Sequence, residues 1–191
     1  MLSYIALAIS CVLVSNVVLT QFLGICPFLG VSKNKKSALG MGLAVMGVTV
    51  SSSIITYGLY KLVLAPLNIT FMKTVVYILV IAALVQFVEM FIKKFFPSLY
   101  NAFGVYLPLI TTNCVVLGVC INVINFDYNF LEMLVYSLSI TVGYMLVLFI
   151  FSAIRSQLDR VSVPKAFKGV PIALIVAACM ALAFSAFSGI I

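Results

Sequence analysis

Long apolar segments separated by short polar linkers make up most of the chain. Each segment has 20 or more residues, and about 20 apolar residues carry an α-helix across a hydrocarbon core of roughly 30 Å. We therefore predict an all-α integral membrane protein with six transmembrane helices. The predicted spans are residues 3–31, 38–65, 71–92, 99–126, 131–154 and 169–191.

Two of these spans are too long to be straight helices. Residues 4–31 and 99–126 have 28 residues each, which is about 42 Å of continuous helix at 1.5 Å per residue. The expected helix breakers are Gly24, Pro27 and Gly30 in the first span and Gly104, Pro108 and Gly118 in the second. Lipid cannot satisfy the polar groups of backbone that leaves the helix at membrane depth. We therefore expect both breaks to lie near the midplane and to face protein.

The two interrupted segments resemble each other. Residues 18–30 read VLTQFLGICPFLG and residues 106–118 read YLPLITTNCVVLG, with Cys-x-x-Leu-Gly in common, 88 residues apart. Each copy lies in the first of three spans, and an odd number of spans reverses the orientation of a second set. We predict one transmembrane domain, residues 1–191, built as an inverted repeat of two three-helix halves, approximately 1–95 and 96–191. Chance similarity between hydrophobic helices is the alternative.

The composition excludes a water-soluble protein. Hydrophobic residues make up 65% of the 191 residues and charged residues only 8%, which leaves loops too short to hold a second, soluble domain. The net charge of +7 would suggest nucleic acid in a soluble protein. In a membrane protein the positive-inside rule explains this charge, and we predict no nucleic-acid partner.

The basic residues predict the orientation of the chain. Of the 11 Lys and Arg residues, nine lie in the first, third and fifth linkers and two in the second. The nine are Lys33, Lys35, Lys36, Lys93, Lys94, Arg155, Arg160, Lys165 and Lys168. This distribution places linkers one, three and five in the cytoplasm and both termini outside.

Two of the five cysteines occupy unusual positions. A cysteine in an apolar helix is most often a small packing residue, and this is our interpretation of Cys11, Cys120 and Cys179. Cys26 and Cys114 stand beside helix breakers, where a thiolate can turn toward a shared centre. They could form a disulfide, or they could ligate a [2Fe-2S] cluster, which takes four thiolates in a chain that has no histidine. Cys26 and Cys114 would supply only two of the four thiolate ligands. If they bind a cluster, we therefore expect a partner chain to supply two more cysteines.

Polar residues within the spans have two interpretations each. Asn16, Gln21, Gln86 and Asn113 could make interhelical hydrogen bonds. Asn113 is adjacent to Cys114, so its amide could instead donate a hydrogen bond to cluster sulfur and raise the reduction potential.

Two other features of the spans are explained by packing or pairing. Glu89 stands four residues before Lys93, which favours a helical ion pair, although an acid inside a span is also a candidate for an ion path. The last span carries small residues at four-residue spacing, which we interpret as a packing face within the chain or toward a partner. These residues are Ala173, Ala177, Ala181, Ser185 and Gly189.

Several sequence strings carry a resemblance to a known family over essentially the whole chain. They are GICPFLGVSK (24–33), VQFVEM (85–90), LPLITTNCVVLGV (107–119) and VPKAFKG (163–169). With them the chain resembles the A subunits of Rnf complexes, the ion-translocating ferredoxin:NAD oxidoreductases. It is also similar to the E subunit, and more distantly the D subunit, of the sodium-translocating NADH:quinone oxidoreductase.

The resemblance implies a six-helix subunit of a redox-driven translocase that is not catalytic alone. It implies pairing with a homologous E-type subunit of inverted topology, the pair sharing a membrane-embedded [2Fe-2S] cluster between four cysteines. The family's cysteines match Cys26 and Cys114. The implied role is an electron relay across the bacterial inner membrane, coupled to Na⁺ or H⁺ transport, together with other Rnf subunits that carry flavin and iron-sulfur centres. A small secondary transporter built on inverted repeats is the alternative, and a structural scaffold is a third possibility.

Overall fold

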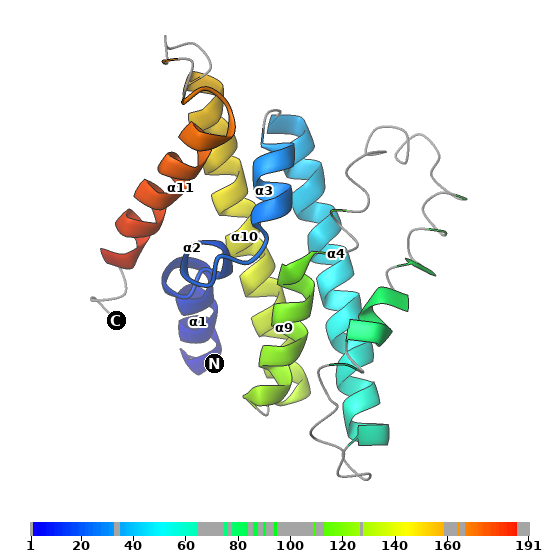
Figure 1. Cartoon of the computed structure of the whole chain (residues 1–191). Coiled ribbons are helices and arrows are strands. Elements are labelled where there is room, and N and C mark those ends of the chain that lie inside the picture. The colour runs from blue at the N-terminus through cyan, green and yellow to red at the C-terminus, as the bar shows by residue number, and fades with distance from the viewer. Residues whose placement is uncertain are drawn as a thin grey trace. The chain divides into compact units, whose positions relative to one another are not determined.

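Helices form all the regular structure in the described part of the chain. The computed structural model describes residues 2–32, 35–64, 75, 78–83, 86, 87, 90, 94, 109, 113–126, 128–158, 164 and 167–186. The helices, in chain order (Figure 1), are α1 (Leu2–Ile9), the π-helix η1 (Ser10–Val14), α2 (Val17–Thr20), α3 (Ile25–Val31), α4 (Lys35–Leu59), the π-helix η2 (Tyr60–Leu64), α9 (Cys114–Asn125), α10 (Phe130–Leu158) and α11 (Val170–Ser185). The prediction of an all-α protein is confirmed.

Two of the described helices are long and apolar enough to cross a membrane. They cover Ser37–Leu62, with 26 residues, and Phe130–Leu158, with 29 residues, and they match the second and fifth predicted spans. Shorter apolar helices occupy Tyr4–Val14, Cys114–Asn125 and Val170–Ser185. Most of the third predicted span and residues 99–108 of the fourth lie outside the described residues, so the number of six spans stays a prediction.

The first predicted span is interrupted twice, as the separate short helices α1, α2 and α3 show (Figure 1). The first interruption, which no helix breaker in the sequence predicts, follows η1. There Ser15 leaves the helix with φ −94° and ψ 44°, and Asn16 is extended. The second interruption covers residues 21–24, where Gly24 adopts a left-handed conformation with φ 81°. Gly24 therefore breaks the helix as predicted, because glycine adopts positive φ without steric cost.

Three of the predicted helix breakers do not break a helix. Pro27 and Gly30 lie inside α3, and Gly118 lies inside the continuous helix α9. Pro27 is tolerated because it occupies the first helical turn, where its missing N–H group is not needed for an intrahelical bond. Glycine inside a helix costs only about 1 kcal/mol relative to alanine, which packing can offset. Gly104 and Pro108 lie outside the described residues.

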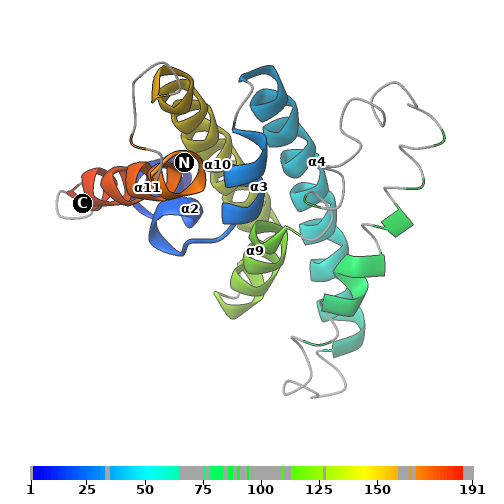
Figure 2. The ribbon, with the colours of Figure 1, turned by 45° about the horizontal axis from the view of Figure 1, so that its top comes forward.

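The chain divides into two compact units. Unit 1 contains Met1–Leu43 and Ser139–Ile191. Its core includes a stack of the Phe28 and Phe151 rings, with centroids 3.9 Å apart and planes at 24°. In this unit α11 packs against α2 and η1, and both views show α11 beside α2 (Figures 1 and 2).

Unit 2 contains Ala44–Leu138. Hydroxyl side chains on α4 donate to carbonyl groups one turn earlier: Thr49 Oγ1 to Val45 O at 2.7 Å and Thr56 Oγ1 to Ser52 O at 2.6 Å. Thr56 Oγ1 also lies 3.8 Å from Cys120 Sγ on α9. Buried hydroxyls in this unit are therefore satisfied mainly by their own helix. The division of the sequence into inverted halves stays a prediction.

Candidate functional site

Cys114 is the first residue of α9 and follows directly on an extended residue. Asn113 has φ −71° and ψ 119°, and its Oδ1 accepts a hydrogen bond from Val115 N at 3.1 Å. This is an N-cap, which satisfies one of the backbone donors that every helix start leaves without an intrahelical partner. The Asn113 cap thereby fixes where α9 begins and places half-buried Cys114 in its first turn.

The amide nitrogen of Asn113 has no hydrogen-bond partner among the described residues. Asn113 is 4% exposed, and its Nδ2 atom is buried. A buried donor without a partner costs about 1–3 kcal/mol. The position beside Cys114 therefore offers an N–H donor to a group outside the described residues.

Asn16 makes the same cap in the first span, but its amide nitrogen is satisfied. It has φ −65° and ψ 118°, and its Oδ1 accepts from Val18 N at 3.1 Å. Its Nδ2 donates to Val12 O at 3.1 Å. Among the described residues, both asparagines bond only within their own predicted spans, so interhelical bonding by Asn113 stays a prediction. Asparagine before an apolar run is a preferred N-cap, and this signal could have revealed both caps.

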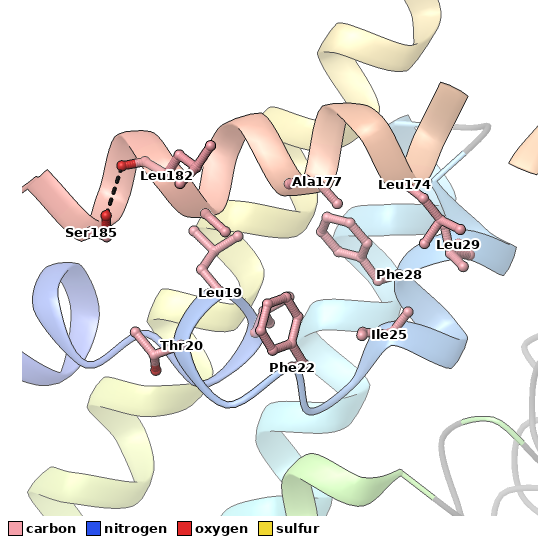
Figure 3. A pocket seen from close by; sticks show the side chains of 13 residues that line it. Leu19, Thr20, Phe22, Ile25, Phe28, Leu29, Leu174, Ala177, Leu182 and Ser185 are labelled. Atoms are coloured by element: carbon pink, nitrogen blue, oxygen red, sulfur yellow. Dashed lines mark hydrogen bonds between the residues drawn. The ribbon is translucent and has the colours of Figure 1, made fainter. Parts of the chain in front are cut away.

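Cys26 is the second residue of α3, and its side chain is exposed in this chain. Its neighbours Ile25, Phe28 and Leu29 line an apolar cavity of about 640 Å³ between α2, α3 and α11, whereas Cys26 does not line it (Figure 3). One face of α3 is therefore turned toward α11, and the thiol of Cys26 remains accessible to a partner.

Cys26 belongs to unit 1, whereas Cys114 and Asn113 belong to unit 2. None of the five cysteines, all of which are described, forms a disulfide. Among the described residues, no group of three or more His, Cys, Asp or Glu side chains could hold a metal ion.

The remaining cysteines have no common environment. Cys11 and Cys120 are buried, as expected for packing residues, whereas Cys179 on α11 is exposed.

The other candidate residues lie on exposed parts of the structure or outside it. Gln21 and Gln86 are exposed, and Glu89 and Lys93 lie outside the described residues.

The predicted stripe of small residues borders the apolar cavity. Ala177, Ala181 and Ser185 on α11 line this cavity, and Ala173 is buried, while Gly189 lies outside the described residues (Figure 3). Small side chains on α11 leave room on the side that faces α2 and α3. The small residues therefore face the rest of unit 1, but they leave the cavity between α11, α2 and α3 unfilled.

Arg155, which was predicted to begin the fifth linker, belongs to helix α10, and Lys35 and Lys36, which were predicted for the first linker, belong to α4. Helix α10 continues to Leu158, and Arg155 is a buried residue of its last turn. A basic residue at the end of an apolar segment looks like a cytoplasmic anchor in the sequence. Only the tertiary structure shows that this side chain turns inward.

Membrane-length apolar helices, together with helices that begin after non-helical backbone, are typical of a helical membrane protein. A family model described as "Rnf-Nqr subunit, membrane protein" matches residues 4–191. The chain belongs to this Rnf-Nqr family.

Three relatives match over almost their entire lengths. The A subunit of the Na(+)-translocating ferredoxin:NAD(+) oxidoreductase complex of Acetobacterium woodii is 51% identical over 188 residues, which is 98% of either chain. The A subunit of the ion-translocating oxidoreductase complex of Histophilus somni is 48% identical and covers 100% of this chain and 99% of its own. The protein of the same name from Vibrio vulnificus is 47% identical, with 100% of both chains covered.

Proposed function

We propose that this chain is the A-type membrane subunit of an ion-translocating ferredoxin:NAD oxidoreductase. Relatives at 47 to 51% identity, matched over their full lengths, are named as the A subunits of ion-translocating oxidoreductase complexes. As one subunit of a redox-driven translocase, the chain is not catalytic alone. It works with other subunits of the complex that carry flavin and iron-sulfur centres.

Cys26 and Cys114 supply two of the four thiolate ligands of an intramembrane [2Fe-2S] cluster in this proposal. A homologous E-type subunit of inverted topology supplies the other two. The observation that carries the assignment is the buried Nδ2 of Asn113 beside Cys114, which has no hydrogen-bond partner in the described part of the chain. An N–H group directed at cluster sulfur satisfies this donor and raises the reduction potential. When bound, the cluster supplies one-electron transfer.

The protein residues around this site hold and orient the ligands. The Asn113 cap fixes the first turn of α9, whose backbone N–H groups carry partial positive charge and favour a nearby anionic centre. Gly24 makes the left-handed turn that begins α3 and places Cys26 in the turn that follows. Cys26 is exposed in the single chain, as a ligand shared with a partner must be.

The full arrangement has six transmembrane helices as an inverted repeat, with both termini outside the bacterial inner membrane. At the break, Phe22 is 59% exposed, which supports a partner at this position, because non-helical backbone at membrane depth must face protein. Electron passage across the pair is coupled to Na⁺ or H⁺ transport.

Cysteine replacement in the complete complex tests the proposal. Cys26→Ala and Cys114→Ala should each abolish the electron paramagnetic resonance signal of the [2Fe-2S] cluster and stop ferredoxin-driven NAD reduction. Cys120→Ala and Cys179→Ala are matched controls and should retain both. A Cys114→Ala complex with its full cluster signal would overturn the assignment. Solute uptake by the purified chain alone in liposomes would favour the transporter alternative instead.

A further inference from the structure

Arg155 is a buried cation that bonds to the end of the helix carrying Cys26. Its side chain is 9% exposed. Arg155 Nη1 donates to Leu29 O at 2.7 Å and to Ser32 Oγ at 2.7 Å. Leu29 lies in the last turn of α3, and Ser32 is the residue that ends this helix. All of these groups belong to unit 1.

The guanidinium meets neutral oxygens at this site and, within the described residues, no carboxylate. A buried charge is tolerated only where other groups compensate it. The last four carbonyl groups of a helix have no intrahelical partner and carry partial negative charge. Leu29 O is one of these four groups in α3, so the end of the helix compensates the charge of Arg155. Arg155 in turn gives this acceptor a short bond of 2.7 Å beside the longer one, 3.5 Å, that it accepts from Ser32 Oγ.

Helix α3 depends on such contacts because it has only seven residues. A helix of this length is not stable on its own in water. The structure attaches it to α10 at two points: the stack of Phe28 on Phe151 and the bonds to Arg155, one turn further along α10. Cys26 precedes these two contacts by two and three residues. Its place relative to α10 is therefore set by them.

We propose that Arg155 is a positioning residue that fixes α3 on α10 and thereby sets how Cys26 meets the metal centre. This inference rests on the proposed function of Cys26 as a cluster ligand. Arg155 bonds to the end of α3 and not to the thiol of Cys26, so it acts through α3. Loss of the contact leaves the ligand in place but changes its geometry, which alters the reduction potential of the cluster.

The test compares Arg155→Met, Arg155→Lys and Ser32→Ala in the purified complex, with Lys168→Met as a charge control. Lys168 is an exposed cation outside α10. The measurements are hydrogen exchange of residues 25–31 and the midpoint potential and resonance spectrum of the cluster. Arg155→Met should speed exchange roughly 10- to 100-fold, the range expected for a lost hydrogen bond to a charged group. It should also shift the potential and the spectrum, and Ser32→Ala should do so to a smaller extent.

Arg155→Lys should restore most of the wild-type behaviour, because both bonds start from one nitrogen and an ammonium group has donors for both. If the complex with Arg155→Met does not assemble, the same measurements on Arg155→Lys and Ser32→Ala test the proposal. Unchanged exchange, or faster exchange with an unchanged potential and spectrum, would overturn the proposal. A wild-type complex without a Cys26-dependent cluster signal would instead overturn the proposed function, and exchange alone would then decide whether Arg155 anchors α3.

Discussion

An asparagine that caps a helix uses its Oδ1 atom for the cap and leaves its amide N–H groups to find another partner. Asn16 donates to Val12 O, whereas Nδ2 of Asn113 has no partner among the described residues. The two caps share their backbone conformation. The difference therefore concerns the surroundings of the amide and not the helix start. This makes Asn16 a control for Asn113.

Replacing each asparagine with serine separates the cap from the amide donor. Serine is also a good N-cap, so Asn113→Ser should keep α9 while removing the N–H donor that we propose for cluster sulfur. We expect a lower midpoint potential of the cluster in the purified complex, because hydrogen bonds to sulfur raise it. Asn16→Ser should leave the potential unchanged and reduce stability by about 1 kcal/mol through loss of the bond to Val12 O. An unchanged potential in Asn113→Ser would mean that the amide serves another group.

The sequence identifies some of these residues but not their contacts. Cys26 and Cys114 can be found because each stands near a recognisable helix breaker in a repeated motif. The roles of Asn113 as a cap and Arg155 as an anchor were missed. The cap has a local signal, an asparagine before an apolar run. The contact of Arg155 has none, because it joins residues 126 positions apart in the sequence.

At the scale of elements, the interrupted first span shows what glycine and proline can and cannot predict. Gly24 breaks the helix because it adopts a positive φ, which an α-helix does not accommodate. Pro27 lies in the first turn of the next helix, where proline is compatible with helical backbone. The earlier break at Ser15 and Asn16 contains neither residue type. It depends on a side-chain cap, and a search for helix breakers does not detect caps.

Gly143 on α10 allows this helix to lie close to the first break. A Cβ atom at Gly143 would lie 3.0 Å from Asn16 Nδ2 and 3.1 Å from both Cα and O of Val12. Because two of these atoms are backbone, they cannot easily move away. Gly143→Ala should therefore lower the thermal unfolding temperature of the purified complex, with a cost of about 1–3 kcal/mol.

Gly47→Ala is the matched control, since no atom lies within 4 Å of a Cβ placed there. It should leave the unfolding temperature unchanged or raise it slightly, because alanine is the better helix former by about 1 kcal/mol. Equal unfolding temperatures for the two variants would show that α10 does not need glycine for its contact with η1.

At the scale of the whole molecule, the predicted orientation is open to direct measurement. Of the nine basic residues from which it was predicted, Arg155 belongs to the last turn of α10, and Lys35 and Lys36 belong to the first turn of α4. Lys168→Cys should react with a membrane-impermeant thiol reagent only from the cytoplasmic side, and exposed Asn129→Cys only from the outside. Labelling of intact cells and of inverted vesicles checks both. The reverse pattern would contradict the inverted pairing with an E-type subunit.

The helical class and the two longest helices were predictable because apolar segments of membrane length are a strong signal. The exact ends of the helices and the faces by which they pack were less predictable. Helix α10 extends beyond its predicted end, and α11 borders a cavity where tight packing was one of the expectations. In these regions nearly every residue is apolar, so hydrophobicity does not show which face of a helix packs against a neighbour.

The non-helical turn at residues 21–24 also affects how a cell treats surplus copies of the chain. Gln21 and Phe22 are exposed, and Cys26 lies just beyond them. In a copy without a partner, the exposed residues Gln21 and Phe22 of this turn meet lipid, which offers no hydrogen bonds to backbone outside a helix. Such a copy is a substrate for membrane proteases, which remove incompletely assembled proteins. We therefore expect the amount of this chain in the membrane to follow the supply of its partner and not its own rate of synthesis.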